Sequence, residues 1–425
     1  MSLPQKVSLR KALLDGFWSG MLALIVFGPI SGLVLQGYEV QNELTRPLLI
    51  AALVAIGRFL VSFCMQTENG RRYLDKLVGK RDAGVTVSSL KKGKYQYLVI
   101  PLLILGGLCL PFVIGKYWLT VVILAMIYVL LGLGLNIVVG LAGMLDLGYV
   151  AFYAVGAYSL AMGAQYFDLG FWTILPLAGI GAALFGAMLG FPVLRMHGDY
   201  LAIVTLGFGE IIRLVLNNML EITGGPNGAS APPPTLFGLE FARSAKQGGV
   251  PFHEYFGIAY SPSYKYIFIY LVLFIIVCLM ILFVTRLKQM PMGRAWEALR
   301  EDEIACRSLG INHVTVKLSA FMMGAMVGGI AGVFFATYQG FINPSSFTFF
   351  ESALILAIVV LGGLGSTVGV IVAALVLTIL PEVLRDFAEY RVLMFGMAMV
   401  LMMVWKPRGL IRIKRKAYAI EEPAA

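Results

Sequence analysis

Long apolar runs constrain this chain more than any other feature of its sequence. Hydrophobic residues make up 59% of the 425 residues, whereas charged residues make up only 13%. The apolar residues gather in stretches of about 20 residues, the length that an α-helix needs to cross about 30 Å of hydrocarbon. The sequence therefore predicts an all-α polytopic membrane protein, and it excludes an ordinary soluble domain.

About 10–11 transmembrane segments are expected. The candidate spans are 12–35, 46–65, 96–115, 117–138, 149–165, 172–194, 200–216, 265–286, 315–338, 351–382 and 391–405. Glycines at 362, 363, 365 and 369 interrupt the stretch 351–382, and its first piece, Ser352–Leu361, reaches only about 15 Å as a helix. We expect a broken or re-entrant pair there, buried in protein or lining a cavity.

Basic residues mark the orientation of the predicted spans. Lysines and arginines gather in 66–95, in 293–312 and in the tail that begins at Lys406. The positive-inside rule places these stretches in the cytoplasm, and counting crossings from a cytoplasmic N-terminus gives the same result. Both termini are then cytoplasmic, and the loop 217–264 lies outside. This distribution accounts for the net charge of +10 without a nucleic-acid partner.

One charged segment, Gly293–Asn312, lies between two apolar runs. Apolar residues recur in it at helical spacing, Glu303 and Arg307 are spaced for an i,i+4 ion pair, and Gly310 is suited to a left-handed stop. Such a segment is too polar for the bilayer core. We expect a short amphipathic helix in the cytoplasm, either docked against a partner or simply solvated. The apolar residues of its stripe are Ala295, Ala298, Leu299, Ala305 and Leu309.

The sequence offers no catalytic constellation. It contains no Ser/His/Asp arrangement, no His-Glu-x-x-His and no P-loop, so any energy from ATP has to come from another subunit. The four cysteines and three histidines are scattered without a metal-ligand spacing. We predict a non-catalytic protein with neither a cofactor nor a metal site.

Polar residues inside the apolar spans are the candidates for a substrate path. Asn136 and Asp146 bracket a glycine-rich stretch, and Glu210 and Arg213 lie on one face of the span 200–216. An ionisable residue in a span is a functional candidate by default, although a structural Glu–Arg pair is an equal alternative. Gly324, Gly328 and Gly332 predict close helix packing. The path candidates are Asn136, Asp146, Thr205, Glu210 and Arg213.

The outer loop 217–264 is long and rich in turn residues. It contains Gly224-Gly225-Pro226-Asn227-Gly228 and three successive prolines at 232–234. Connections of this length usually have a function, so we expect a small cap that receives a partner, with an ordinary connector as the alternative. The contact candidates are Thr223, Gly224 and Asn227.

Several long stretches resemble a known family. LGLNIVVGLAGMLDLGYVAFYAVGAY, GDYLAIVTLGFGEIIRLVLNN with TGGPNG, GRAWEALREDEIACRSLGIN, VLGGLGSTVGVIVAALVL and WKPRGL occur in this order. Together they resemble the LivM-type permease subunit of bacterial branched-chain amino acid ABC transporters, over about residues 117–411. We accordingly divide the chain into an N-terminal extension with three spans (1–115), a permease core (116–411) and a cytoplasmic tail (412–425).

The resemblance implies a multi-subunit importer in the bacterial inner membrane. Its other parts would be a LivH-type permease, two ABC ATPases and a periplasmic amino-acid-binding protein, and the substrates would be leucine, isoleucine and valine. The segment Gly293–Asn312 would be the coupling helix, with Arg294, Glu297, Arg300, Glu303, Ala305 and Gly310 as its candidate residues. One departure is clear, because the usual Glu-Ala-Ala before the glycine is here Ile304-Ala305-Cys306, with the acid at Glu303.

Three alternatives differ from this interpretation. An ABC permease for urea or short amides would share the same architecture. A secondary transporter or channel for a small neutral solute would act alone, with Glu210 and Asp146 as carriers of protons or Na⁺. A membrane-bound enzyme would need a nucleophile, a metal cluster or an acid/base pair, and none is evident in the sequence.

Overall fold

The structure is a computed structural model that describes residues 96–193, 198–236, 238–241, 249–257 and 259–383, with single positions and short pieces elsewhere. Contacts divide the chain into two units, Met1–Gly84 and Val85–Ala425. In the first unit, strands β1 (Leu33–Gln36) and β2 (Glu39–Asn42) form an antiparallel hairpin. The predicted span 12–35 is therefore too long at its end, where Leu33 already belongs to a strand. Nearly all of the rest of that span, and nearly all of 46–65 and 391–405, lie outside the described residues.

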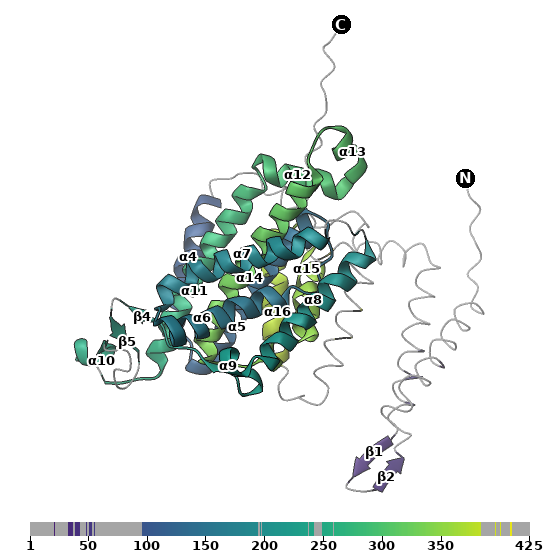
Figure 1. Cartoon of the computed structure of the whole chain (residues 1–425). Coiled ribbons are helices and arrows are strands. Elements are labelled where there is room, and N and C mark those ends of the chain that lie inside the picture. Colours follow the sequence, from purple (N-terminus) through teal and green to yellow (C-terminus); the bar gives the residue numbers. More distant parts are fainter. Residues whose placement is uncertain are drawn as a thin grey trace. The chain divides into compact units, whose positions relative to one another are not determined.

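Helices dominate the second unit (Figure 1). Two longer elements are interrupted: the π-helix η2 (Asn136–Leu141) directly follows α5, and α12 is followed by a separate short helix, α13. The helices of eight residues or more are α4 (Gln96–Val113), α5 (Lys116–Leu135), α6 (Val150–Phe167), α7 (Phe171–Val193), α8 (Asp199–Asn218), α11 (Ser263–Leu287), α12 (Pro291–Glu301), α14 (His313–Gln339), α15 (Phe349–Gly362) and α16 (Thr367–Val383).

The helices of this unit fit the predicted membrane class. Among the residues that the structure describes, six helical segments are long and apolar enough to cross a bilayer: Lys116–Leu141, Phe171–Pro192, Tyr200–Asn218, Ser263–Leu287, His313–Gln339 and Pro344–Gly362. The first five agree with predicted spans, apart from small differences at their ends, and the predicted spans 96–115 and 149–165 form α4 and α6, which are not among the six. The predicted stretch 351–382 is divided at its glycines into α15 and α16, with Gly363 and Gly365 at positive φ in the turn between them. The number of times this pair crosses the membrane stays a prediction.

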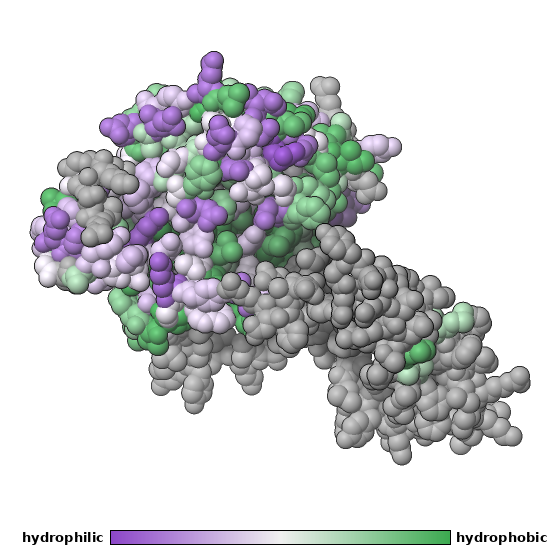
Figure 2. All heavy atoms as spheres, turned by 90° about the horizontal axis from the view of Figure 1, so that it is seen from below, coloured by the Kyte–Doolittle hydropathy of each residue, from purple (hydrophilic) through white to green (hydrophobic). Residues whose placement is uncertain are grey.

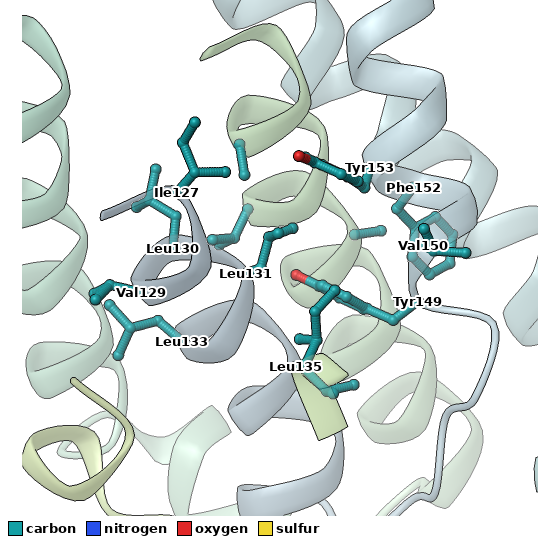
Figure 3. Close-up of a cluster of buried hydrophobic side chains, with 14 of the residues drawn as sticks. Ile127, Val129, Leu130, Leu131, Leu133, Leu135, Tyr149, Val150, Phe152 and Tyr153 are labelled. Atoms are coloured by element: carbon teal, nitrogen blue, oxygen red, sulfur yellow. The ribbon is translucent and has the colours of Figure 1, made fainter. Parts of the chain in front are cut away.

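The core of the bundle lies among α5, α6 and α14. Helix α5 carries buried aliphatic side chains on several faces. Tyr149, just before α6, and Tyr153 on α6 point into the same cluster (Figure 3). The hydroxyl of Tyr149 donates a hydrogen bond to the carbonyl of Gly324 on α14 at 2.9 Å. Because the protein interior excludes water, this bond satisfies a buried polar group and joins two central helices. The core is thus packed solid rather than hollow.

Glycines allow α6 and α14 to touch along their backbones. A Cβ atom added at Gly156 would lie 2.0 Å from the carbonyl oxygen of Gly329, and one at Gly332 would lie 2.2 Å from that of Tyr153. Lipid tails are as apolar as leucine, so membrane helices associate through such close packing rather than through the hydrophobic effect. The predicted ridge of Gly324, Gly328 and Gly332 is confirmed as a packing surface inside the chain.

Short elements close one end of the bundle, which we call the α9 end. Helix α9 (Leu220–Thr223) and the 3₁₀ turn η3 (Gly225–Asn227) follow α8, and strand β3 (Ala229–Ser230) pairs antiparallel with β7 (Phe341–Ile342). This pairing ties the loop after α8 to the connection between α14 and α15. The remaining small elements are β4 (Thr235–Leu236), β5 (Leu239–Glu240), β6 (Val250–Pro251), α10 (Phe252–Tyr255) and the 3₁₀ turn η4 (Pro344–Ser346).

The surface agrees with a membrane-spanning bundle. Seen from the α9 end, hydrophilic residues lie across the face, and hydrophobic residues gather toward its edge (Figure 2). Large apolar side chains are also exposed along the flanks, for example Leu184 on α7 and Leu282 on α11, at 61% and 60%. A soluble protein rarely exposes contiguous apolar surface of this kind, whereas a bilayer covers it.

We expect Gly156→Val to destabilise the bundle. The added side chain would overlap the Gly329 backbone, which has no flexible end that could give way, and overpacking of this kind costs at least about 1–3 kcal/mol. Thermal unfolding of the detergent-solubilised protein should show a lower midpoint. Gly181→Val is the matched control, because a Cβ atom there meets nothing within 4 Å. Equal midpoints for the two variants would contradict the close approach.

Candidate functional site

The predicted charged helix is two helices. Helix α12 (Pro291–Glu301) ends at Asp302, and α13 (Glu303–Ser308) begins there. The carboxylate of Asp302 accepts hydrogen bonds from the backbone N–H groups of Ile304 and Ala305, at 2.8 and 3.0 Å. An aspartate at an N-cap satisfies two donors that a helix start leaves free, so it stabilises a new start rather than a continuous helix. The expectation of one continuous helix is wrong for this reason.

Helix α12 is anchored on α14 by a buried tryptophan. The side chain of Trp296 is fully buried, and its indole Nε1–H donates to the carbonyl of Val316 at 3.0 Å. The Glu303 carboxylate binds Arg307 at 2.6 Å, as the i,i+4 spacing predicts, and also Lys317 on α14 at 2.8 Å. Both helices therefore hold a defined position relative to α14.

Two large apolar side chains are exposed on α13 and directly after it. Ile304 and Leu309 are 77% and 79% exposed, and Ala305 is exposed between them, whereas Leu299 and Cys306 are buried. The predicted apolar stripe is thus split: its α12 part faces the bundle, and its α13 part faces away. Gly310 ends the segment at φ 80°, the left-handed stop expected of it. Among the other candidates, Arg294 and Glu297 are exposed.

Arg300 turns from α12 into the bundle. Its guanidinium donates to the carbonyl of Gly140 in η2, and its aliphatic stem lies against Gly143, whose φ is 74°. A Cβ atom at Gly143 would lie 2.6 Å from Cγ of Arg300, so only glycine leaves room for the stem. Arg300, a candidate residue of the predicted coupling helix, thus holds the carbonyl end of a π-helix inside this chain.

A second cation holds the turn between α15 and α16. The Lys288 ammonium donates to the carbonyl of Gly365 at 2.5 Å and to the hydroxyl of Thr367 at 2.7 Å. Burial lowers the pKa of Lys288 to about 8, and the charge of Glu297 opposes this shift. Lys288 therefore remains mostly protonated at pH 7. In addition, Asn136 Oδ1 accepts from the Gly365 N–H at 2.8 Å, which joins η2 to the same turn.

We define the junction as Arg300, Lys288, Asn136, Gly140 and Gly365. It brings α12, the end of α11, η2 and the α15–α16 turn together at the end of the bundle opposite α9, which we call the α12 end. A cavity of about 230 Å³ adjoins it, lined in part by Gly143, Leu201, Leu299, Arg300 and Glu303. π-Helical turns are rare in proteins and frequently lie at functional sites, so η2 beside this cavity marks a candidate functional region.

Asp146 and Thr205 meet where the segment that precedes α6 packs against α8. Asp146 is 1% exposed, and its Oδ1 accepts from the Gly148 N–H at 2.9 Å. The Thr205 hydroxyl accepts from the Leu147 N–H at 3.1 Å, and a Cβ atom at Gly148 would lie 1.9 Å from the Thr205 carbonyl oxygen. These residues hold backbone groups inside the chain, and so does Asn136. Their role in a substrate path stays a prediction.

Glu210 and Arg213 form the ion pair that their spacing predicts. Arg213 Nε lies 3.0 Å from both carboxylate oxygens of Glu210. Their side chains are 29% (Arg213) and 42% (Glu210) exposed, although both lie near the middle of the span Tyr200–Asn218. The structure does not bring this pair together with Asn136 or Asp146.

The loop after α8 presents one of its three candidates to solvent. Thr223 is buried, and its hydroxyl donates to the carbonyl of Leu216 at 2.6 Å. Gly224 adopts φ 74° in the turn that follows, and Asn227 is exposed. Thr223 therefore shapes the loop from inside, and Asn227 is the candidate that a partner can reach directly.

Sequence reasoning missed Lys288, Trp296 and Lys317. Lys288 follows an apolar run, where a lysine is ordinarily assigned to the membrane surface. Trp296 is not part of the predicted apolar stripe, which consists of alanines and leucines. Lys317 lies in the first turns of the predicted span 315–338, where a charge is uncommon. That position indicates a residue with a specific partner.

A bundle of long apolar helices with polar elements at both ends defines a multi-pass membrane protein. Residues 117–404 match the family described as branched-chain amino acid transport system / permease component, and the chain belongs to this family. Residues 11–109 match a second family, described as a domain of unknown function. No solved structure matches this chain.

Relatives of two kinds are similar to this chain. It is 55% identical over 334 residues to the high-affinity branched-chain amino acid transport system permease protein LivM of Escherichia coli strain K12, covering 78% of each chain. The probable LivM of Methanocaldococcus jannaschii is 28% identical, over 66% of this chain and 84% of its own. The permease protein LivH of E. coli strain K12 is 25% identical, over 67% of this chain and 91% of its own.

We expect Arg300→Met to loosen the junction. The substitution keeps an apolar stem but leaves the Gly140 carbonyl without its charged donor, which costs about 1–3 kcal/mol. The thermal midpoint of the purified protein should fall by several degrees. Arg294→Met is the matched control, since Arg294 is exposed on the same helix. If both variants unfold at the wild-type temperature, Arg300 does not hold η2.

Proposed function

We propose that this chain is the membrane-spanning permease subunit of an ATP-driven importer of branched-chain amino acids. It would form half of the path for leucine, isoleucine and valine, and separate subunits would hydrolyse ATP. Membership of the permease family and 55% identity to a LivM protein support this proposal. A permease binds no cofactor and needs no catalytic group of its own.

The observation that carries the proposal is the exposed apolar surface of α13. Ile304 lies on a short helix outside the bundle and Leu309 directly follows it, yet α12 and α14 hold that helix in place through Trp296 and Lys317. Exposed apolar side chains on a fixed helix favour burial in a groove of a partner. A soluble ATPase fits this role, because force that passes from a soluble protein to a membrane path needs a rigid element shared by both.

The junction supplies a route from that surface into the membrane. A displacement of α12 moves Arg300 and therefore the carbonyl end of η2. The Asn136–Gly365 hydrogen bond then carries the displacement to the α15–α16 turn, which Lys288 also holds. The adjoining cavity leaves room for this movement. Binding of nucleotide to the ATPase would in this way change the packing of α5, α15 and α16.

Close packing of the core favours a substrate path at the surface of this chain rather than through it. Central side chains such as Ile127, Leu130 and Phe334 are at most 1% exposed. A path between two permease subunits needs no hole through either one. LivH is related to this chain along 91% of its own length, so two such chains can pack with approximate twofold symmetry around a shared path. We therefore infer a LivH-type permease as partner.

The α12 end faces the cytoplasm in this proposal, and the α9 end faces the periplasm. The basic stretches and the count of crossings support that orientation, with both chain termini in the cytoplasm of a bacterial inner membrane. The cap after α8 is then available to a periplasmic binding protein, which would deliver the amino acid and carry out most of the selection.

We expect Ala305→Glu to separate the permease from its ATPase. Ala305 is exposed beside Ile304, so a glutamate there would bury an unpaired charge in the contact and cost several kcal/mol of docking. Because α13 lies outside the bilayer, the variant should reach normal membrane levels, lose the ATPase on purification and support no uptake of leucine.

Gln289→Glu is the control for this variant. Gln289 is exposed at the same end of the bundle, and the substitution adds the same charge outside α12 and α13. It should keep both the ATPase and uptake. If Ala305→Glu also keeps both, then α13 is a solvated segment and not the coupling helix.

We expect a photocrosslinker at Asn227 to capture the binding protein. Asn227 is exposed on the loop after α8, and the β3–β7 pairing holds that loop in place. The same crosslinker at Gln289, at the α12 end, should capture no binding protein. Labelling of lipid or permease alone at Asn227 would show that the proposed contact lies elsewhere.

A further inference from the structure

The ion pair of α8 lies in an unusual place for two charges. The span Tyr200–Asn218 is 28% buried, the lowest share among the six spans, and Glu210 lies at its centre. Both side chains of the pair are partly exposed, at 29% for Arg213 and 42% for Glu210. Charges at mid-membrane depth do not face lipid tails but protein or water-filled cavities. This face of α8 therefore borders an aqueous space or the partner permease.

The same face carries an apolar surface beside the ion pair. Ile203, Gly207, Glu210 and Leu214 follow one another at steps of three and four residues, so they lie along one stripe of the helix. Ile203 and Leu214 are 64% and 46% exposed. A Cβ atom at Gly207 would meet nothing within 4 Å, so the backbone is open between them. The face thus combines one anion, one cation and a shallow apolar space.

We propose that Glu210 and Arg213 bind the two charged groups of a free amino acid as it passes α8, while its aliphatic side chain lies over Gly207. The Arg213 guanidinium would take the α-carboxylate in a bidentate pair, and the Glu210 carboxylate would accept from the α-ammonium. This inference rests on the proposed function as an amino acid permease, and it assigns the residues that contact the substrate.

Charge balance supports this assignment. A zwitterion has no net charge, and the Glu210–Arg213 pair has none either, so their complex adds no net charge to the membrane. When no substrate is present, the two side chains satisfy each other at 3.0 Å, which avoids an unpaired charge. When a substrate arrives, each group exchanges one partner for another. Such exchange binds weakly enough for release, which a transport path requires.

The pair also explains how the path distinguishes its cargo. A solute that lacks the ammonium or the carboxylate would separate Glu210 from Arg213 and leave one of them without a partner. Polar groups of a site that a solute leaves unpaired at mid-membrane depth discriminate against that solute, often more strongly than the size of an apolar pocket. The site therefore favours zwitterions with an aliphatic side chain over urea and short amides.

The test uses the full transporter in proteoliposomes, with its ATPase and with binding protein loaded with L-leucine. Glu210→Gln and Arg213→Gln should each lower leucine uptake at least about 10-fold, while assembly and ATP hydrolysis stimulated by the binding protein persist. The swap Glu210→Arg with Arg213→Glu should restore the ion pair and assembly but not uptake, because the charges then stand at the wrong positions along the stripe. If the swap restores uptake, the pair is structural and the proposal is overturned.

The open glycine supplies a second, independent measurement. Gly207→Leu should lower leucine uptake about 10-fold relative to valine uptake, since a larger helix side chain removes space for the longer substrate. Gly181→Leu on α7 is the matched control, because a Cβ atom there also meets nothing within 4 Å, and it should leave the leucine-to-valine ratio unchanged. If the charge variants fail to assemble, this comparison decides: an equal ratio in both glycine variants overturns the proposal. Absence of leucine uptake by the wild-type complex would instead overturn the proposed function itself.

Discussion

Direct contact between the backbones of α6 and α14 is the constraint on which the rest of the described bundle depends. Helices in a bilayer gain nothing by hiding apolar surface from lipid, so their association rests on close packing and on buried hydrogen bonds. Gly156 and Gly332 remove the side chains that would keep the two backbones apart, and Tyr149 adds a hydrogen bond to α14. The position of α14 then determines where α12, α13 and α7 can pack.

Much of this architecture could be predicted because the membrane simplifies the physics. A hydrophobic stretch of fixed length has few alternatives to a helix, so the spans from 96 to 338 agree with helices in the structure. The glycine ridge on α14 and the Glu210–Arg213 pair were predictable for a similar reason, because both depend on spacing within one helix. Local periodicity is sufficient wherever the interaction is itself local.

The junction at the α12 end could not be predicted in this way. Asn136 and Gly365 are 229 residues apart, and Arg300 reaches Gly140 across 160 residues. No periodicity within a single segment indicates such pairs, because they arise from how separate helices pack. The break at Asp302 is different, since an aspartate is among the residues preferred at an N-cap. The flanking residues continue the helical period across Asp302, so the period alone predicts one helix although the N-cap residue indicates two.

Helix α14 has one further consequence. It runs unbroken for 27 residues, about 40 Å, from the contacts of Trp296 and Lys317 at one end to strand β7 at the other. A helix of this kind is stiff along its axis, so a tilt imposed at one end displaces the opposite end as well. In the described part of the chain, α14 thus connects the α12 end to the α9 end as one stiff element. A displacement at the α12 end therefore reaches the α9 end only if the core packed around α14 moves with it.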